Sequence, residues 1–152
     1  MSDSRIRVLL HKGLEQHEAQ AAIELEALAR SVGSDGFYPF SFESGAVVLK
    51  SLLAAIISDA RSGVSCATIA RRFHSTMVEI VGAMAELVRR ESGINIVALS
   101  GGCFQNRLLL DTSIARLESA GFRVLTHHRV PANDGGLALG QAVIAAGRAT
   151  GE

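Results

Sequence analysis

The sequence has little of what nucleic-acid-binding proteins use. Its 152 residues include no tryptophan and one tyrosine, and 15 Lys and Arg residues are balanced by 15 Asp and Glu residues. A balanced charge produces no overall field that would attract nucleic acid or an anionic membrane. Without aromatic side chains interleaved with basic ones, the chain also lacks a surface on which bases would stack. We therefore expect no nucleic-acid partner.

Cysteines and long apolar runs are also scarce. Cys66 and Cys103 are too few and too far apart for a disulfide framework or a cysteine metal cluster. The longest apolar stretch, residues 46–57, contains Lys50 and is too short to cross a bilayer. The N-terminal sequence lacks the apolar core of a signal peptide. We expect a soluble, cytoplasmic protein with no membrane partner, and a single domain over residues 1–152.

Residues 94–110 are the most informative stretch, because they predict a strand, a glycine turn and a helix in succession. Residues 94–99 are apolar and rich in β-branched side chains, which predicts a strand buried on both faces. The sequence Ser-Gly-Gly at 100–102 ends this strand, and helical spacing runs from about Phe104 to Gly121. A glycine turn before a helix N-terminus can bind a phosphate, and it is equally typical of a plain tight turn.

Four further helices are predicted from apolar residues that recur every three or four positions. They cover residues 16–30, 44–61, 65–91 and 137–148, and the third is predicted to be capped by Ser65, since serine is a preferred N-cap residue. The apolar stripe of this third helix consists of Ile69, Phe73, Met77, Ile80, Val81, Met84, Leu87 and Val88.

A second short strand at 122–126, followed by a loop and the last helix, completes an α/β pattern. We therefore predict a helix-rich α/β fold whose small sheet contains a parallel pair. A sheet this small needs something else to cover it. Because ligands bind at the carboxyl ends of parallel strands, the turn at 100–102 and the sequence Asn-Asp-Gly-Gly at 133–136 should meet in one crevice.

Several polar residues near this crevice have a structural and a functional interpretation. Residues 133–136 are either a turn with a helix cap, or a site where Asp134 binds a divalent metal beside phosphates. Asn106 is either a cap or a contact to a ligand's hydroxyl or base. His74 is interpreted as a boundary histidine rather than a metal ligand, and Cys103 as a small buried thiol rather than a nucleophile.

Two glutamates of the first helix, Glu24 and Glu26, lie off its apolar face. Their simplest interpretation is that they belong to the solvated face of this helix.

Four segments, in order along the chain, resemble the C-terminal part of the hydrogenase-maturation carbamoyltransferases (HypF). The resemblance covers residues 16–148 and leaves 1–15 as a short N-terminal extension. The segments are QAAIELE at 20–26, IARRFH at 69–74, IVALSGGCFQNRLL at 96–109 and VPANDGGLALGQ at 130–141.

This resemblance implies the second lobe of an actin/Hsp70-like (ribonuclease H-like) ATPase fold, related to the tRNA threonylcarbamoyltransferases. It implies binding of ATP or carbamoyl-adenylate and of a divalent metal (Mg, Fe or Zn), which polarises the reacting group. In the family, the carbamoyl group passes to the C-terminal cysteine thiol of HypE and ends as a cyanide ligand of nickel-iron hydrogenase. By analogy, the nucleotide-binding residues are Ser100, Gly101, Gly102, Asn106 and Glu24, and the metal ligand is Asp134.

The chain departs from the family pattern in its metal ligands. The family's metal site also takes two histidines, spaced i and i+4, from the other lobe, and no His-x-x-x-His occurs here. We therefore expect a lobe that is inactive in carbamoyl transfer without the first lobe and the upstream domain that makes carbamoyl-adenylate. Its apolar face, where the first lobe would pack, could drive self-association. The alternative is a stand-alone interaction or regulatory module that retains the fold without the chemistry.

Overall fold

The computed structural model describes residues 19–150, apart from the side chains of residues 134, 149 and 150. The predicted class, a helix-rich α/β fold with a parallel pair in a small sheet, is confirmed. In the described part, no helix has both the length and the apolar character needed to cross a lipid bilayer. The elements are the α-helices α2 (Gln20–Arg30), α3 (Lys50–Arg61), α4 (Cys66–Ser92), α5 (Arg107–Ser119) and α6 (Leu137–Thr150), the strands β1 (Ser41–Glu43), β2 (Ala46–Val48), β3 (Ile96–Ala98) and β4 (Arg123–Leu125), and the 3-10 turns η1 (Gly102–Gln105) and η2 (Asp134–Gly136).

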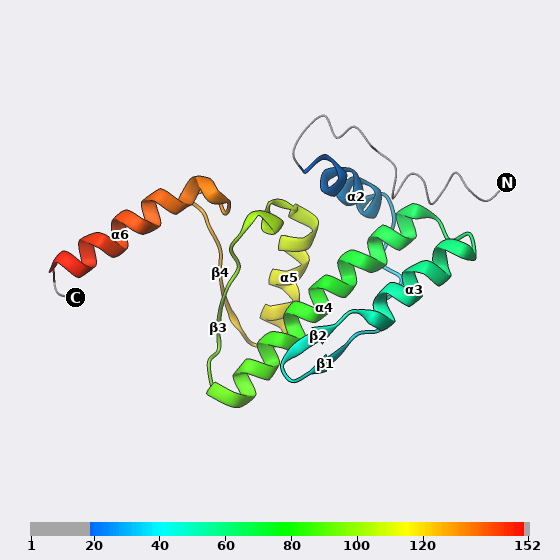
Figure 1. Cartoon of the computed structure of the whole chain (residues 1–152), viewed down its shortest axis with the longest axis horizontal. Helices are drawn as coiled ribbons and strands as arrows, with labels where there is room; N and C mark the ends of the chain where they lie inside the picture. The colour runs from blue at the N-terminus through cyan, green and yellow to red at the C-terminus, as the bar shows by residue number, and fades with distance from the viewer. Residues whose placement is uncertain (1–18, 151–152) are drawn as a thin grey trace.

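The long helix α4 is the element against which α2, α3 and α5 pack, and α6 extends away from this body (Figure 1). Its N-terminus is capped by Ser65, whose hydroxyl accepts a hydrogen bond from the N–H of Thr68 at 3.1 Å. Its C-terminus ends at Gly93, which has the left-handed conformation (φ 74°) that glycine adopts at little cost. The predicted helix over residues 65–91 is therefore confirmed.

The predicted helix over residues 44–61 is wrong at its start. Strands β1 and β2 form an antiparallel hairpin there, and α3 begins at Lys50. Ser44 and Gly45 make the turn of the hairpin with φ values of 51° and 80°. Two successive residues with positive φ match the right-handed twist of a hairpin and cannot continue a right-handed helix.

Strands β3 and β4 form the predicted parallel pair, with Ile96 opposite Arg123. The N–H of Leu99 extends the ladder by donating to the carbonyl of Leu125 at 2.9 Å. Helix α5 makes the crossover between the two strands, and it ends just before Gly121 (φ 81°), as predicted.

The prediction that residues 94–99 are buried on both faces is wrong. Ile94 and Ile96 are 53% and 50% exposed, and within β3 only Val97 is half-buried. One face of the pair is covered by α4 and α5, while the other faces outward, because the described chain supplies no layer over it. The core beneath the covered face is formed by Leu99, Leu117 and Phe122.

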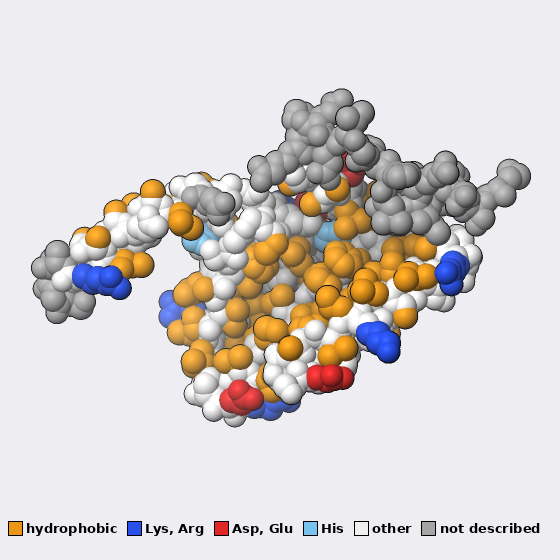
Figure 2. Space-filling view, viewed as in Figure 1, with side chains coloured by type: hydrophobic (Ala, Val, Ile, Leu, Met, Phe, Trp, Pro, Cys, Tyr) orange, Lys and Arg blue, Asp and Glu red, His pale blue; other side chains and the backbone are white. Residues whose placement is uncertain are grey.

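The apolar stripe predicted for α4 is only partly buried. Ile69 is buried and Val81 packs against the core, whereas Met84 and Val88 remain 40% and 45% exposed. In Figure 2, hydrophobic side chains gather over a broad face of the body, in the region where Figure 1 draws α3, α4 and the strands. The buried positions of α4 are Ile69, Ala70, His74, Thr76, Val78 and Gly82.

Candidate functional site

The glycine turn after β3 lies against the loop that joins β4 to α6. Gly101 has φ 107° and ψ 159°, a conformation that side-chain-bearing residues rarely adopt. Its N–H donates to the carbonyl of Ala132 at 2.8 Å, and its carbonyl accepts from the N–H of Phe104 at 3.1 Å. The two glycine-containing turns are therefore adjacent, as predicted. The N–H of Gly101 already has a partner within the chain.

The second turn, at residues 133–136, is shaped by Asn133. Its side-chain oxygen accepts from the N–H of Gly135 at 3.1 Å, and its carbonyl accepts from the N–H of Gly136 at 3.0 Å. A Cβ atom at residue 136 would lie only 2.8 Å from the carbonyl oxygen of Pro131, so a glycine is required there. The interpretation of this segment as a turn is confirmed. The side chain of Asp134 lies outside the described part, so its role as a metal ligand stays a prediction.

Asn106 links the start of α5 to a buried histidine on α4. Its Oδ1 accepts from the N–H of Leu109 at 2.8 Å, and its Nδ2 donates to Nε2 of His74 at 2.8 Å. The other ring nitrogen of His74, Nδ1, donates to the carbonyl of Ala70 at 2.8 Å. These partners fix the neutral tautomer that carries its proton on Nδ1, because an amide nitrogen only donates and a carbonyl only accepts.

The helix-cap interpretation of Asn106 and the structural interpretation of His74 are therefore both confirmed. His74 is 4% exposed and fully satisfied. An amide group has two N–H donors and two oxygen lone pairs. Asn106 uses one of each inside the protein, so one N–H and one lone pair remain for a ligand.

A cavity of about 350 Å³ opens between α2, α4 and η1, beside Asn106. This volume and a mostly apolar lining with a few polar groups are typical of small-molecule sites. The cavity brings together two of the predicted site residues, Gly102 and Asn106, whereas Ser100, Gly101 and Glu24 are not among the described residues that line it. Its principal walls are Glu26, Phe73, His74, Met77, Gly102 and Asn106.

Glu26 is part of this wall, and its assignment to a solvated face is wrong. Its side chain is 15% exposed, and its Oε1 accepts from the N–H of Leu108 in the first turn of α5 at 3.1 Å. The carboxylate thus lies at a helix N-terminus, where negative charge is stabilising. The one local signal for the burial of Glu26 is that it lies three residues before the buried Ala29, on the same side of the helix. Glu24 instead accepts a hydrogen bond from Gln20 at 3.0 Å.

Near the glycine turn, the exposure of Cys103 differs from the prediction, and a contact between Ser100 and His127 was not predicted. Cys103 is exposed and lines the cavity, so the prediction of a buried thiol is wrong. Ser100 Oγ lies 2.8 Å from Nε2 of the exposed His127. In the parallel register, Ala98 lies opposite Leu125. If this register continues for two more positions, Ser100 lies opposite His127.

A polar cluster outside the cavity holds the segment after α2 against α3 and α4. Oδ2 of Asp59 accepts from the Tyr38 hydroxyl at 2.8 Å and from Nη1 of Arg72 at 2.7 Å, and Arg72 also pairs with Asp35. Burial, together with the hydrogen bond to Asp59, raises the pKa of the Tyr38 hydroxyl well above its ordinary value. The hydrogen bond from Arg72 lowers the pKa of the Asp35 carboxyl.

A metal site does not arise from the described side chains. No group of three or more His, Cys, Asp or Glu side chains that could hold a metal ion occurs among them.

Comparison with known protein families identifies one matching family. The model described as "Carbamoyltransferase, Kae1-like Domain, second subdomain" matches residues 5–141. The chain is 38% identical to the carbamoyltransferase HypF of Synechocystis sp. over 128 residues, which are 82% of this chain and 16% of that protein. It is 37% identical to a HypF homolog of Cupriavidus necator over 145 residues, which are 90% of this chain and 36% of that protein.

Solved structures of HypF proteins have the same fold over nearly the whole chain. A full-length HypF crystallised in a phosphate- and nucleotide-bound form superposes with a TM-score of 0.83 and 39% identity, and the match covers 95% of this chain and 19% of that one. T. kodakarensis HypF gives a TM-score of 0.75 and 27% identity, over 96% of this chain and 19% of that one. This chain thus spans a fifth or less of the length of these two proteins.

Proposed function

Because the chain belongs to the HypF carbamoyltransferase family, through the second subdomain of the Kae1-like domain, we propose that it forms one half of a nucleotide-binding cleft for carbamoyl transfer. The ligand would be ATP or carbamoyl-adenylate, and the acceptor a cysteine thiol of a HypE-like protein. The observation that carries this proposal is the cavity lined by Gly102 and Asn106, two residues of the family-like glycine motif.

The residues around the cavity suit a nucleotide with a phosphate at the glycine turn. Gly102 has no side chain to separate the backbone from a phosphate, and nothing lies within 4 Å of the position that a Cβ would take. The remaining N–H and lone pair of Asn106 would bind a hydroxyl or the base. Ser100 and Gly101 would border the phosphate, and Glu24 would lie towards the ribose.

Asp134 would hold a divalent metal beside the phosphates. A carboxylate oxygen is the ligand type that hard cations such as Mg²⁺ prefer. When bound, the metal would polarise the phosphate-linked carbamoyl group and stabilise charge on the departing AMP. Asp134 begins η2, immediately after the loop that is hydrogen-bonded to Gly101, so its backbone is near the glycine turn.

The exposed apolar face would pack against the first subdomain, whether that subdomain lies on the same polypeptide or on another one. Side chains such as Leu53 and Ile57 on α3 are 54% and 51% exposed, and contiguous apolar surface of this kind marks interaction sites. The same observation favours the second candidate function, a non-catalytic interaction or regulatory module that uses this face to bind a partner protein. In either case, we expect the 152-residue chain alone to be inactive in carbamoyl transfer.

The proposal is tested by the thermal stability of the purified chain with and without ATP and Mg²⁺. Ligand at about a hundred times its Kd adds about 2.7 kcal/mol to the free energy of unfolding. For a domain of this size, each kcal/mol raises Tm by about 2–4 °C. We expect an increase of several degrees that Asp134→Ala removes. Asp111→Ala, an exposed aspartate on α5, is the matched control and should retain the increase. No increase in the unaltered chain would refute nucleotide binding by this chain on its own.

A further inference from the structure

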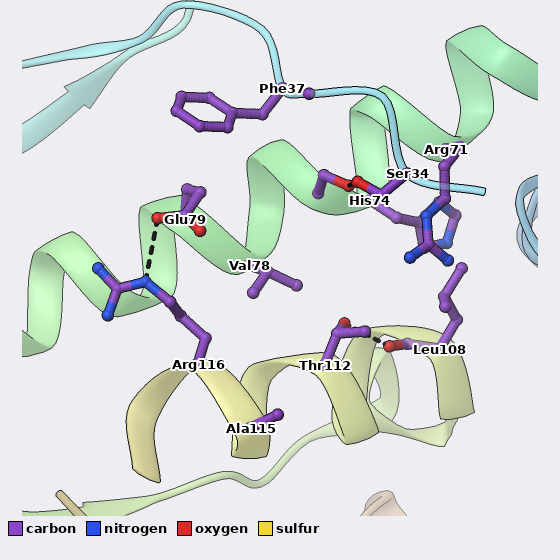
Figure 3. A pocket seen from close by; sticks show the side chains of 12 residues that line it. Ser34, Phe37, Arg71, His74, Val78, Glu79, Leu108, Thr112, Ala115 and Arg116 are labelled. Carbon is purple, nitrogen blue, oxygen red and sulfur yellow. Dashed lines mark hydrogen bonds and ion pairs between the residues drawn. The ribbon is translucent and has the colours of Figure 1, made fainter. Parts of the chain in front are cut away.

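We infer that the chain carries a second ligand site, for a small organic anion, in a cavity of about 290 Å³ (Figure 3). The cavity lies between the segment at residues 34–37, α4 and α5. It goes beyond the proposed function, because only the buried His74 is shared with the lining of the cavity at the glycine turn. His74 separates the two spaces, so a ligand in one does not occupy the other.

Arg71 provides the first observation in support of this site. In Figure 3 its guanidinium group projects from α4 into the space above Leu108 and next to His74. Its Nε is buried and has no hydrogen-bond partner among the described residues. A guanidinium group has only donors, and a buried donor without an acceptor is unfavourable. A carboxylate or phosphoryl group in the cavity would pair with the terminal nitrogens of this guanidinium group through charge-assisted hydrogen bonds.

The other arginines of this region already have carboxylate partners. At the opposite end of the cavity, Arg116 donates to Glu79 at 3.0 Å and to Glu86 at 2.9 Å. Outside the cavity, Arg72 is paired with Asp35 and Asp59. Among the guanidinium groups that line the cavity, that of Arg71 is thus the one for which the described residues provide no carboxylate partner.

The shape of the cavity favours an anion with an apolar part. Between Arg71 and the Arg116–Glu79 pair, the walls are Val78 on α4 and Ala115 on α5. The ring of Phe37, which is 56% exposed, lies at the opposite side of the space. An aromatic or short aliphatic body would contact these side chains while its acidic group pairs with Arg71.

The test is an NMR titration of the isotopically labelled chain with two probes, benzoate and inorganic phosphate. We expect benzoate to shift the amide resonances of Ser34, Ser75 and Thr112, which line the cavity, with a Kd on the order of millimolar. Stronger binding of benzoate than of phosphate identifies a carboxylate with an apolar body, and the reverse order identifies a phosphoryl group.

Substitutions at Arg71 test whether this side chain binds the acidic group of the ligand. Arg71→Met keeps the aliphatic stem and should weaken binding about tenfold or more. Arg71→Lys keeps the positive charge but loses the planar guanidinium group that donates two parallel hydrogen bonds, so it should give an intermediate Kd. Arg90→Met, at an exposed arginine of α4 that does not line the cavity, should leave the Kd unchanged.

The inference is overturned if neither anion shifts the amides of the cavity, or if Arg71→Met binds as the unaltered chain does. Shifts confined to Gly101 and Gly102 would also overturn it, because they would place the anion at the glycine turn. Since no nucleotide is used, this result is independent of the thermal test of the proposed function.

Discussion

Asn106 satisfies two groups that would otherwise have no partner, one on each of two helices. Its oxygen accepts from the N–H of Leu109, and its amide group donates to Nε2 of His74. The same side chain is also the one that we propose to contact a nucleotide. Its position is thus fixed by the fold before any ligand binds, which is the preorganisation that favours affinity.

Replacing Asn106 with alanine should lower the free energy of unfolding by about 2–4 kcal/mol. Loss of a helix cap accounts for about 1 kcal/mol, and leaving the buried Nε2 of His74 without a donor adds about 1–3 kcal/mol. Urea denaturation measures the difference. The control is Asn95→Ala, whose side chain is exposed and which should stay within about 0.5 kcal/mol. Equal effects of the two substitutions would contradict the assigned role of Asn106.

Because the pKa of Tyr38 is raised by folding, we expect the protein to lose stability at alkaline pH. The unfolded chain releases the phenol proton of Tyr38 first. Stability from this group is therefore fully present below the ordinary tyrosine pKa of about 10, and it is lost as the pH rises above that value. Tyr38→Phe should flatten the dependence of unfolding free energy on pH in this range.

The spectroscopic check on Tyr38 is direct, because it is the single tyrosine of the chain and there is no tryptophan. Tyrosinate absorbance should rise together with the loss of helical circular dichroism, since the hydroxyl is bonded to Asp59 in the folded state. A phenol that ionises near its ordinary pKa while the helices remain intact would contradict the assignment.

At the scale of elements, the close contact between α4 and α5 depends on Gly82. A Cβ added there would lie 3.0 Å from Cζ and 3.2 Å from Cγ of Arg116. The guanidinium group of Arg116 is held by Glu79 and Glu86, so it cannot move away without breaking these ion pairs. The glycine thus lets an arginine of α5 lie across the surface of α4.

Gly82→Leu should destabilise the chain by about 1–3 kcal/mol, the usual effect of overpacking a tight contact. The control is Gly140→Leu on α6, where nothing lies within 4 Å of the new Cβ. Chemical denaturation of both variants, and of Gly82→Leu combined with Arg116→Ala, measures the coupling between the two sites. The double variant should lose less than the sum of the single variants, whereas strict additivity would show that the two residues do not interact.

The elements that could be predicted are those that local spacing determines. The helix over residues 65–91 and the parallel pair were identified, because helical periodicity and short β-branched runs are local signals. The hairpin before α3 was missed, because Ser44 and Gly45 stand beside an apolar run that also suits a helix. Periodicity finds an apolar face but not the element that covers it, so the exposure of Met84 could not be predicted.

The candidate site was also predictable only where the local sequence and the chain topology determine it. Adjacency of the two glycine turns follows from parallel topology alone. The contact between Glu26 and the N–H of Leu108 joins residues 82 positions apart, and no local pattern encodes it. The exposure of Cys103 depends on the 3-10 turn η1, where regular helix had been predicted to begin.

At the scale of the whole molecule, a net charge of zero occurs together with an apolar face that the described residues leave uncovered. The formal net charge is zero at pH 7, so copies of the chain do not repel one another. The face carries exposed apolar side chains from α3, α4 and the parallel strands (Figure 2). Burial of such side chains contributes about 1.5–3 kcal/mol each, so contact between two copies is favourable when nothing else covers them.

We therefore expect the purified chain to associate with itself as its concentration increases, as measured by sedimentation velocity. Ile57→Glu should weaken this association about tenfold or more, because it replaces a contact worth at least about 1.4 kcal/mol with a buried charge. Ser58→Glu adds the same charge at the next, exposed position of α3 and should have little effect. If both glutamates dissociated the chain equally, the cause would be net charge rather than the apolar face. If the chain stayed monomeric at all concentrations, the face would be too weakly apolar to bind a copy of itself, and its packing against a first subdomain would need complementary contacts that a second copy does not offer.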